Sequence, residues 1–215
     1  MKKQLKIILS FLMMTAFLFS CKESPEQKSE AIATPEAQEL KEFMLAGPYF
    51  MQDFGAVEGI EKMIPNSGNT KKMIDGYRDV FIFPFTKEQQ ADTKNIFKTM
   101  WDVNSKADLD EVMDYLLHTK DERNPHKAWD YSRVVNNACL GYSAGYLTKI
   151  EAKKYISEAF VLAKKDYKTW DDYFKDFNIG RNIWQPNSDE KAMYDKIIVD
   201  LTKNSEGIYG LLPLN

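Results

Sequence analysis

The histidines and cysteines of this chain, the side chains that most often hold transition metals, are few. The histidines are His118 and His126, and the cysteines are Cys21 and Cys139. A helix would place His126 and Asp130 on one face, but two such groups hold a metal weakly, since a structural zinc site takes four protein ligands and a catalytic site three. The sequence therefore predicts no metal site. His126 follows a proline where a helix begins, and we expect it in the first turn, near solvent.

One serine stands in a pattern that is typical of hydrolases. Ser143 lies between Gly141 and Gly145, as in the Gly-x-Ser-x-Gly turn, but that turn joins a strand to a helix, and here both flanks have helical character. We therefore expect Gly141 and Gly145, with Ala138, to form a stripe of small residues where another helix approaches closely. Cys139 is predicted to be a small buried hydrophobe. The chain lacks the glycine-rich loops that bind phosphates, so no cofactor is expected.

Acidic residues are numerous, and a pair of them could serve a hydrolase or bind calcium. Asp172 and Asp176 lie four residues apart, on one helical face, next to Asp171. The alternation of oxygen ligands around a glycine that marks a calcium loop is missing. Scattered acids in a chain with 28% charged residues are typical of a solvated face, which we expect here. An envelope hydrolase acting through carboxylates is kept as the alternative function.

Polar side chains set among aromatic residues give the best indication of a binding site. Asp130 and Arg133 lie beside a tryptophan, and Arg181 lies beside Trp184. The planar guanidinium of arginine pairs with anions through two hydrogen bonds, so in a cleft these residues could grip a carboxylate, a sugar acid or a peptide end. In the other interpretation, Asp130 pairs with an arginine inside the fold and ties helices together. The candidate binding residues are therefore Asp130, Arg133, Arg181 and Trp184.

Helix signals that would position these residues recur along the chain. Thr86 with Gln89, and Thr148 with Glu151, match the capping box, in which each partner satisfies a free backbone N–H of a helix start. An apolar stripe predicts a helix between residues 107 and 118; it consists of Leu109, Val112, Met113, Leu116 and Leu117. A second stripe follows Thr148 and consists of Ala152, Tyr155, Ile156, Ala159 and Ala163.

The remaining patterns complete a helical fold. Thr34 before Pro35 begins a helix that we expect to reach about Phe54, bent or broken at Gly47-Pro48. Further helices are predicted over about residues 70–80, 126–146, 169–184 and 188–203. Residues 81–85 are apolar and extended in character. Whether they form a short strand is left open, although a single strand makes no sheet. The predicted fold class is all-α, a compact multi-helix single domain.

Several of these elements, taken together, resemble a known family. In chain order they are Trp101-Asp102-Val103, the helix from Asp108 to Leu117, Trp129-Asp130-Tyr131-Ser132-Arg133, the segment from Gly141 to Leu147, Glu151-Ala152, Thr169-Trp170 and Gly180-Arg181-Asn182-Ile183-Trp184. Their order resembles the bacterial domain of unknown function 1266 over roughly residues 70–185. The resemblance implies a helical fold and no established reaction. Residues 34–69, an N-terminal helical extension, and 186–215, a C-terminal helix and tail, look peculiar to this chain.

The first residues have the layout of an export signal. A basic head of three lysines precedes an uncharged apolar run of roughly thirteen residues, which is too short to span a bilayer comfortably. The segment Leu18-Phe19-Ser20-Cys21 resembles the lipobox of bacterial lipoproteins. This resemblance implies that residues 1–20 are a signal peptide and that Cys21 carries fatty acyl chains, such as palmitate, that anchor the protein to a membrane.

The residues after the cysteine bear on location. Residues 22–33 are polar, with almost no large apolar group, so we expect a flexible tether. Lys22-Glu23 looks like the charged export signal of some bacterial surface lipoproteins. We therefore predict a membrane-anchored lipoprotein of a bacterial cell envelope, in the outer membrane, with periplasmic and surface-facing orientations both left open.

Net charge limits the partners. Loss of residues 1–20 removes three lysines and no acid, which takes the net charge from −3 to about −6 and argues against nucleic-acid binding. The sequence thus predicts a lipid-anchored envelope protein of unknown molecular activity, a binding or scaffolding helical domain without catalysis. The membrane is one partner through Cys21, and an envelope protein, a peptide or a glycan stays open as the other.

Overall fold

Helices make up 75% of the computed structural model, and the residues that it describes, 24–65, 68–186 and 190–215, contain no strand. The predicted all-α class is therefore confirmed. The helices are α1 (Pro25–Ile32), α2 (Pro35–Met44), α3 (Gly47–Phe50), α4 (Val57–Met63), α5 (Thr70–Phe81), α6 (Gln90–Ile96), α7 (Lys106–His118), α8 (Lys127–Ala144), α9 (Lys149–Asp166), α10 (Trp170–Trp184), α11 (Glu190–Lys203) and α12 (Ile208–Leu211). Shorter helical turns are η1 (Gln52–Phe54), η2 (Lys87–Gln89) and the π-helical η3 (Phe97–Trp101). The predicted signal peptide, Cys21 and Lys22-Glu23 lie outside the described residues.

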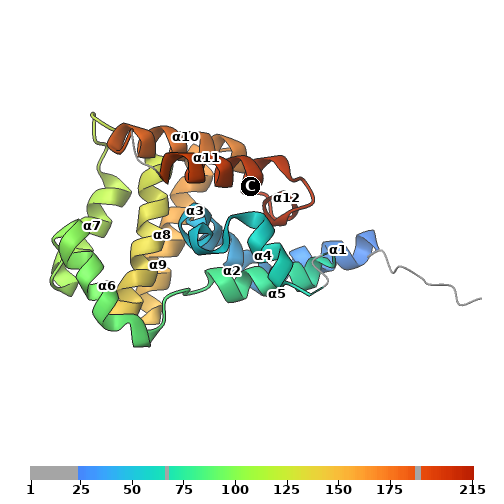
Figure 1. Ribbon diagram of the computed structural model, residues 1–215, viewed down its shortest axis with the longest axis horizontal. Coiled ribbons are helices and arrows are strands. Elements are labelled where there is room, and N and C mark those ends of the chain that lie inside the picture. The colour runs from blue at the N-terminus through green and yellow to red at the C-terminus, as the bar shows by residue number, and fades with distance from the viewer. Residues whose placement is uncertain (1–23, 66–67, 187–189) are drawn as a thin grey trace, which may run out of the picture.

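Two long helices, α8 and α9, form the centre of the fold (Figure 1). The turn that joins them begins at Gly145, which ends α8 in the left-handed conformation with φ 79°. α10 and α11 lie across one end of this pair, α6 and α7 lie along α8, and α2 and α5 lie on the other side (Figure 1). α8 is therefore covered by neighbours on most sides, which explains why most of its residues are buried.

Both predicted capping boxes are present. Thr148 Oγ1 accepts from Glu151 N at 3.2 Å, and Glu151 Oε2 accepts from Thr148 N at 2.8 Å, so this pair starts α9. Thr86 and Gln89 form the same reciprocal pair. Their box starts only the single turn η2, which leads directly into α6.

The N-terminal and C-terminal segments share one core. The Tyr209 hydroxyl in α12 donates to Met44 O at 2.9 Å, and the Trp170 indole in α10 donates to Leu212 O at 2.7 Å. A side chain at position 47 would collide with Tyr209, so Gly47 permits this close approach. The segments before residue 70 and after residue 185 thus pack into the same hydrophobic core as the rest.

The segment expected to be a flexible tether contains helix α1, so that prediction was wrong for residues 25–32. Ser24 Oγ accepts from Gln27 N at 3.2 Å, and Gln27 Oε1 accepts from Ser24 N at 3.0 Å, with Pro25 at the first helical position. Ala31 and Ile32 are partly buried against the core. The capping hydrogen bonds and these two apolar contacts stabilise a helix in this segment despite its polar composition.

The single helix expected from residue 34 to about residue 54 is three elements, α2, α3 and η1. The break falls at Leu45 and Ala46, just before the expected Gly47-Pro48. The carbonyl of Leu45 accepts from Ser132 Oγ at 2.6 Å and from Tyr173 Oη at 3.3 Å. Because side chains of α8 and α10 satisfy this carbonyl, α2 can end there without losing a buried hydrogen bond.

The strand left open at residues 81–85 does not form. Phe81 completes α5, and Phe83 has the left-handed φ of 55°, which is uncommon for a bulky residue. Its ring packs against the rings of Phe43, at 5.3 Å between centroids, and Tyr142, at 4.9 Å. These aromatic contacts hold the unusual backbone in place.

Candidate functional site

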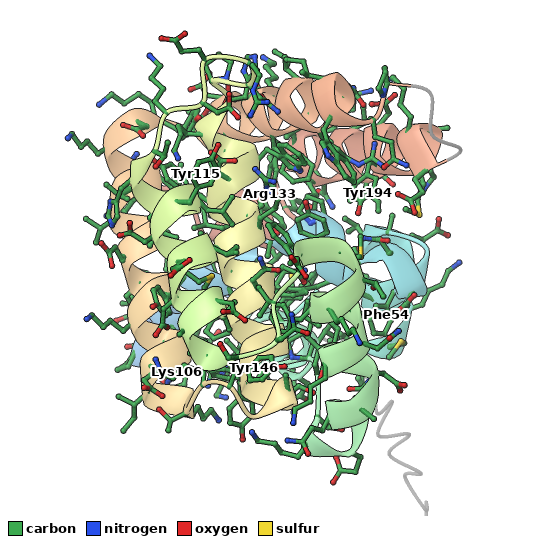
Figure 2. The ribbon with its side chains drawn as sticks, turned by 90° about the vertical axis from the view of Figure 1, so that its left-hand side faces the viewer. Phe54, Lys106, Tyr115, Arg133, Tyr146 and Tyr194 are labelled. Atoms are coloured by element: carbon green, nitrogen blue, oxygen red, sulfur yellow. The ribbon has the colours of Figure 1, made fainter. Side chains whose placement is uncertain are left out.

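Three of the four candidate binding residues line one cavity. Arg133 of α8 and Arg181 and Trp184 of α10 border a cavity of about 550 Å³ between α3, α8, α10, α11 and the turn η3. We call it the aromatic pocket, because its wall includes Tyr49, Phe85, Trp101, Trp129, Trp184 and Tyr194. Arg133 and Tyr194 lie on the face turned toward the viewer in Figure 2. Residues from distant parts of the chain thus converge on one site.

The floor of the pocket is a buried aromatic network. The indole N–H of Trp129 donates to the hydroxyl of Tyr49 at 3.0 Å. The ring of Tyr49 also meets those of Phe177, at 5.8 Å between centroids, and Tyr194, at 6.0 Å, both edge to face. Burial raises the pKa of Tyr49 to about 12, so its hydroxyl is neutral at physiological pH.

Arg133 is held between indole rings. Its guanidinium lies 3.6 Å from the ring centroid of Trp129 and 5.6 Å from that of Trp101, and it donates to Asp130 one turn earlier in α8. Its Nε is buried without a hydrogen-bond partner among the described residues. Stacking and the ion pair fix the plane of the guanidinium, as recognition of a planar anion requires.

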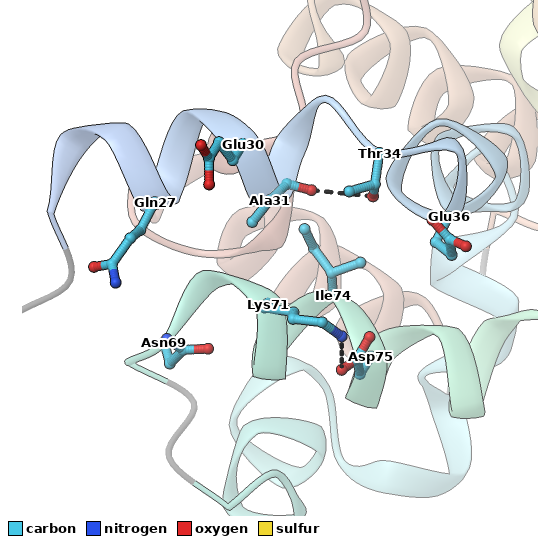
Figure 3. A pocket seen from close by; sticks show the side chains of 9 residues that line it. All are labelled: Gln27, Glu30, Ala31, Thr34, Glu36, Asn69, Lys71, Ile74 and Asp75. Atoms are coloured by element: carbon cyan, nitrogen blue, oxygen red, sulfur yellow. Dashed lines mark hydrogen bonds and ion pairs between the residues drawn. The ribbon is translucent and has the colours of Figure 1, made fainter.

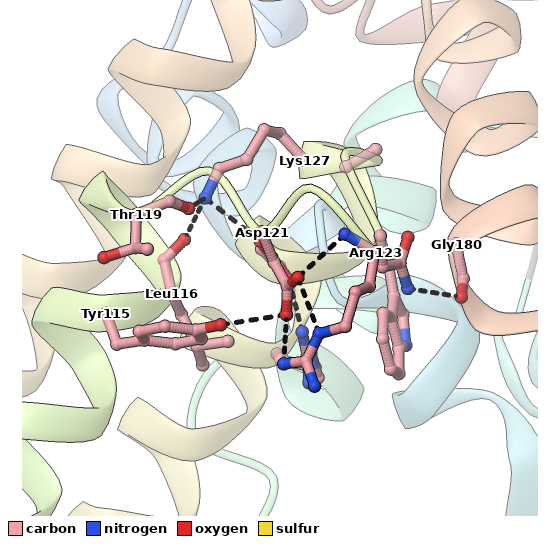
Figure 4. Close-up of polar contacts among 12 residues, drawn as sticks. Tyr115, Leu116, Thr119, Asp121, Arg123, Lys127 and Gly180 are labelled. Atoms are coloured by element: carbon pink, nitrogen blue, oxygen red, sulfur yellow. Dashed lines mark hydrogen bonds and ion pairs between the residues drawn. The ribbon is translucent and has the colours of Figure 1, made fainter. Parts of the chain in front are cut away.

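Asp130 lies behind the pocket wall and joins two cations. It accepts from Arg133 and from Lys127 Nζ at 3.0 Å, and its side chain is 8% exposed. Lys127 also donates to Leu116 O and to Thr119 O, at the end of α7 (Figure 4). These contacts agree with the interpretation of Asp130 as part of a structural network. Asp130, Lys127 and Arg133 together carry one net positive charge.

Arg181 forms the opposite side of the pocket. Its side chain is 3% exposed, its guanidinium lies 3.9 Å from the ring centroid of Tyr194, and it donates to Glu190 at 3.0 Å. Trp184 is 62% exposed, and its ring lies 5.8 Å from that of Trp129. The four candidate residues thus divide into Arg133, Arg181 and Trp184 at the surface of the cavity and Asp130 behind it.

An irregular helical turn completes the wall. η3 is a π-helix whose widened turn presents Met100 and Trp101 to the cavity. Asp102 ends it in the left-handed conformation, with φ 54°. π-helical turns often occur at functional sites. Sequence reasoning used Trp101 only for the family resemblance and missed Tyr49 and Tyr194, because nothing in the sequence places them near Arg133.

The loop between α7 and α8 is held by polar contacts. Asp121 accepts two hydrogen bonds from the Arg123 side chain and one from the Tyr115 hydroxyl, at 3.1 Å (Figure 4). These contacts hold the pKa of Asp121 well below its usual range. The Asn124 side chain donates to Gly180 O at 2.8 Å, which ties the loop to α10. The start of α8, and with it Arg133, is thereby fixed relative to α10.

His126 precedes α8 as its N-cap residue, as its place after a proline indicated, and it is only partly buried. Its Nδ1 lies 2.6 Å from Asp176 Oδ1, and both side chains are 23% exposed. Asp176 also accepts from Ala128 N at 3.1 Å and from the Tyr167 hydroxyl. It therefore satisfies a free N–H at the start of α8. The solvated face expected for the acids of α10 holds for Asp171 and Asp172, which are exposed, and fails for Asp176.

The two glycines of the expected stripe have different roles. At Gly141 an added Cβ would lie 2.7 Å from Leu109 Cδ2, so α7 does pack closely there. Gly145 is the C-cap of α8, and an added Cβ there would lie 2.6 Å from Gln90 Nε2 of α6, so the two glycines face different helices. Ser143 is buried and donates to Thr86 O at 2.5 Å. Cys139 is buried as predicted, and burial raises the pKa of its thiol.

Two further properties concern metals and membranes. Within residues 24–65, 68–186 and 190–215, no three histidine, cysteine, aspartate or glutamate side chains gather where they could hold a metal ion. In the same part of the chain, no helix has both the length and the apolar character needed to cross a bilayer.

The fold and the pocket define an all-helical domain with an aromatic, arginine-bearing cavity. The sequence model of the family described as "protein of unknown function (DUF1266)" matches residues 86–214, so the chain belongs to this family. The match includes the C-terminal segment that looked peculiar to this chain. It covers most of the pocket wall but leaves out Tyr49. Neither the curated proteins nor the solved structures contain a match to the chain.

Proposed function

We propose that this protein is a lipid-anchored binding protein of the bacterial cell envelope. Its helical domain would hold, in the aromatic pocket, a small ligand that joins a carboxylate to an apolar or ring-shaped body. The observation that carries the proposal is Arg133, stacked on Trp129 with its Nε buried and without a partner among the described residues. A cavity of about 550 Å³ lies within the roughly 300–1,000 Å³ of small-ligand sites.

The charges on the Arg133 side of the pocket favour an anion there, while Asp53 lines another part of the wall. Asp130 is shared by Lys127 and Arg133, so these three side chains leave one positive charge next to the cavity. On the opposite side Glu190 neutralises Arg181. A ligand carboxylate would pair with the excess charge, and the indole and phenol rings would cover the rest of the ligand.

Hydrolysis through carboxylates is less well supported than binding. Such a reaction needs one acid and one base on either side of the bond that is cleaved. The acids that line the pocket are Glu190, which is bound to Arg181, and Asp53, which is exposed on η1. Asp130 is engaged by two cations behind the wall. This arrangement suits recognition of an anion better than proton transfer to a ligand.

The binding proposal is tested by calorimetric titration of the soluble domain, residues 22–215, with indole-3-acetate and with its neutral analogue indole-3-acetamide. We expect the acid to bind at least about tenfold more tightly than the amide, because a charged hydrogen bond contributes about 1.5–3 kcal/mol. Arg133→Gln should abolish this preference. Arg78→Gln is the matched control, since Arg78 is similarly buried and also paired with an acid, Glu39, but lies in α5. Equal binding of acid and amide to the unaltered domain would overturn the proposal.

The lipid anchor is tested separately, in cells that express the full chain. Labelled palmitate should be incorporated into the unaltered protein, and Cys21→Ser should remove the label, because the cysteine sulfur is the proposed site of acylation. Label that persists in Cys21→Ser would contradict the anchor and leave the pocket proposal untouched.

A further inference from the structure

A second hollow lies directly beside the aromatic pocket. It has a volume of about 500 Å³, and both cavities are lined by Trp101 and Arg133. Trp101 and Arg133, whose guanidinium lies 5.6 Å from the Trp101 ring centroid, therefore form a wall common to both. In Figure 2, Tyr115 of the second hollow, Arg133 and Tyr194 of the pocket follow one another across the same face of the molecule. The two cavities therefore adjoin along this face, and we call the pair of them, with Trp101 and Arg133 between, the groove.

The second hollow is lined by three acids and one cation, whereas the pocket is lined by two of each. We call it the acidic hollow, because Asp102, Asp108 and Glu111 line it. Asp108 Oδ2 accepts from the backbone N–H groups of Asn104 and Ser105, both at 2.9 Å, and these bonds lower the pKa of Asp108. Asp108 is therefore ionised at physiological pH. Asp102 and Glu111 are exposed, so their carboxylates are accessible to a ligand.

Resting on the proposed function, we propose that the ligand is a short peptide that spans the whole groove. Its C-terminal carboxylate lies in the aromatic pocket beside Arg133, with an apolar last side chain against the rings. A lysine or arginine side chain, or the amino terminus, lies over Asp102, Asp108 and Glu111. A carboxylate and a cation separated by a few residues match the two ends of the groove, whereas a neutral glycan would use the rings and leave both charged ends unpaired.

Another cavity, far from the groove, does not compete with it. It lies between α1, the start of α2 and α5, with a volume of about 540 Å³ (Figure 3). The charged groups along its wall include Lys71, which pairs with Asp75 at 2.8 Å in the same helix. Its wall has no aromatic ring, so it offers none of the stacking contacts of the groove.

The inference is tested with synthetic tetrapeptides titrated into the soluble domain. The probes are Lys-Ala-Ala-Phe with a free C-terminus, its C-terminal amide, and Ala-Ala-Ala-Phe with a free C-terminus and an acetylated amino terminus. We expect the lysine peptide to bind at least about tenfold more tightly than either of the others, because the amide lacks the carboxylate and the acetylated peptide lacks both positive charges. Glu111→Lys should remove the preference for lysine. Glu26→Lys, the same change in α1 on the opposite side of the molecule, should keep it.

Each outcome decides between the two proposals. A preference for the free carboxylate without any preference for lysine, or an equal effect of Glu111→Lys and Glu26→Lys, would overturn the peptide inference and leave the pocket proposal standing. Loss of the carboxylate preference with both indoles and peptides would overturn the pocket proposal itself. Tighter binding of tetra-N-acetylchitotetraose than of the lysine peptide would identify the groove as a glycan site and overturn the inference.

Discussion

The two ends of α8 differ in what they bring together. At the C-terminal end, Gly141 and Ala144 let neighbouring elements approach closely, and the hydroxyl of Ser143 is satisfied by Thr86 O. At the other end, Trp129 and Arg133 border a cavity of about 550 Å³. Small side chains allow helices to close the space between them. At the Trp129 end, large rings line the cavity that we propose as the ligand site.

The partly buried ion pairs of Asp130 with Lys127 and Arg133 also lie at the Trp129 end of α8. Ion pairs behind the pocket wall are costly to bury, and apolar residues of similar volume often stabilise a fold as well or better. Their presence at one end of α8 is therefore a reason to look for function there. The following predictions test this contrast between a packing end and a binding end.

The largest effect is expected at the binding end. Asp130→Asn keeps the shape of the side chain but leaves Lys127 and Arg133, which are 16% and 20% exposed, without their shared carboxylate. Breaking a buried pair on one side costs about 3–5 kcal/mol of unfolding free energy. At roughly 2–4 °C per kcal/mol, the melting temperature should fall by several degrees or more.

Urea unfolding and calorimetry measure this change. Asp171→Asn is the control, because Asp171 pairs with Lys175 on the solvent side of α10, where both side chains are at least half exposed. We expect it to change stability little. If Asp130→Asn leaves the free energy of unfolding unchanged or raises it, the Asp130 cluster is not part of the structural support of α8.

A smaller loss is expected at the packing end. Gly141→Leu would force a side chain against Leu109 and Leu147, and overpacking of this kind costs typically about 1–3 kcal/mol. Gly68→Leu is the control, since nothing lies within 4 Å of a Cβ at that position. A Gly141→Leu variant as stable as Gly68→Leu would show that α7 yields at this contact and that the two ends of α8 are less different than proposed.

The smallest effect concerns the floor of the pocket. Tyr49→Phe removes the hydrogen bond from Trp129, which contributes about 0.5–1.5 kcal/mol. Tyr146→Phe, which removes a bond to the exposed Asn104 O, should cost less.

Alkaline pH sharpens this test. Burial raises the pKa of Tyr49 to about 12, whereas an unfolded tyrosine ionises near 10. The native state therefore holds this proton more tightly than the unfolded state does. The contribution of Tyr49 to the free energy of unfolding is fully present below pH 10 and is lost as the pH rises toward 12. Between pH 9 and pH 11, Tyr49→Phe should lose less stability in urea unfolding than the unaltered domain. Equal losses would show that Tyr49 ionises as it does in the unfolded chain.

Sequence patterns were informative where the deciding contacts are local. The capping boxes at Thr86 and Thr148 join residues three apart, and the chain alone shows both partners. The box formed by Ser24 and Gln27 has the same spacing, but the polar composition of its segment hid it. Local patterns therefore predicted most helices and failed where composition was given more weight than capping.

The candidate site was only partly predictable. Arg133 and Arg181 were identified because each lies near a tryptophan in the sequence. Tyr49 meets Trp129 across 80 residues, and His126 meets Asp176 across 50, and no spacing rule connects such pairs. Long-range contacts of this kind depend on how helices pack, so the far wall of the pocket and the contacts of Asp176 required the structure.

The most direct test of a ligand site at the Trp129 end of α8 uses the four tryptophans of the chain as reporters. Trp101, Trp129 and Trp184 line the pocket, whereas the indole N–H of Trp170 is buried against Leu212 O, away from it. Indole N–H signals in ¹⁵N NMR spectra should therefore shift for the first three, and not for Trp170, as indole-3-acetate is added. Shifts of similar size in all four signals, or none at saturating ligand, would contradict a binding site in the aromatic pocket.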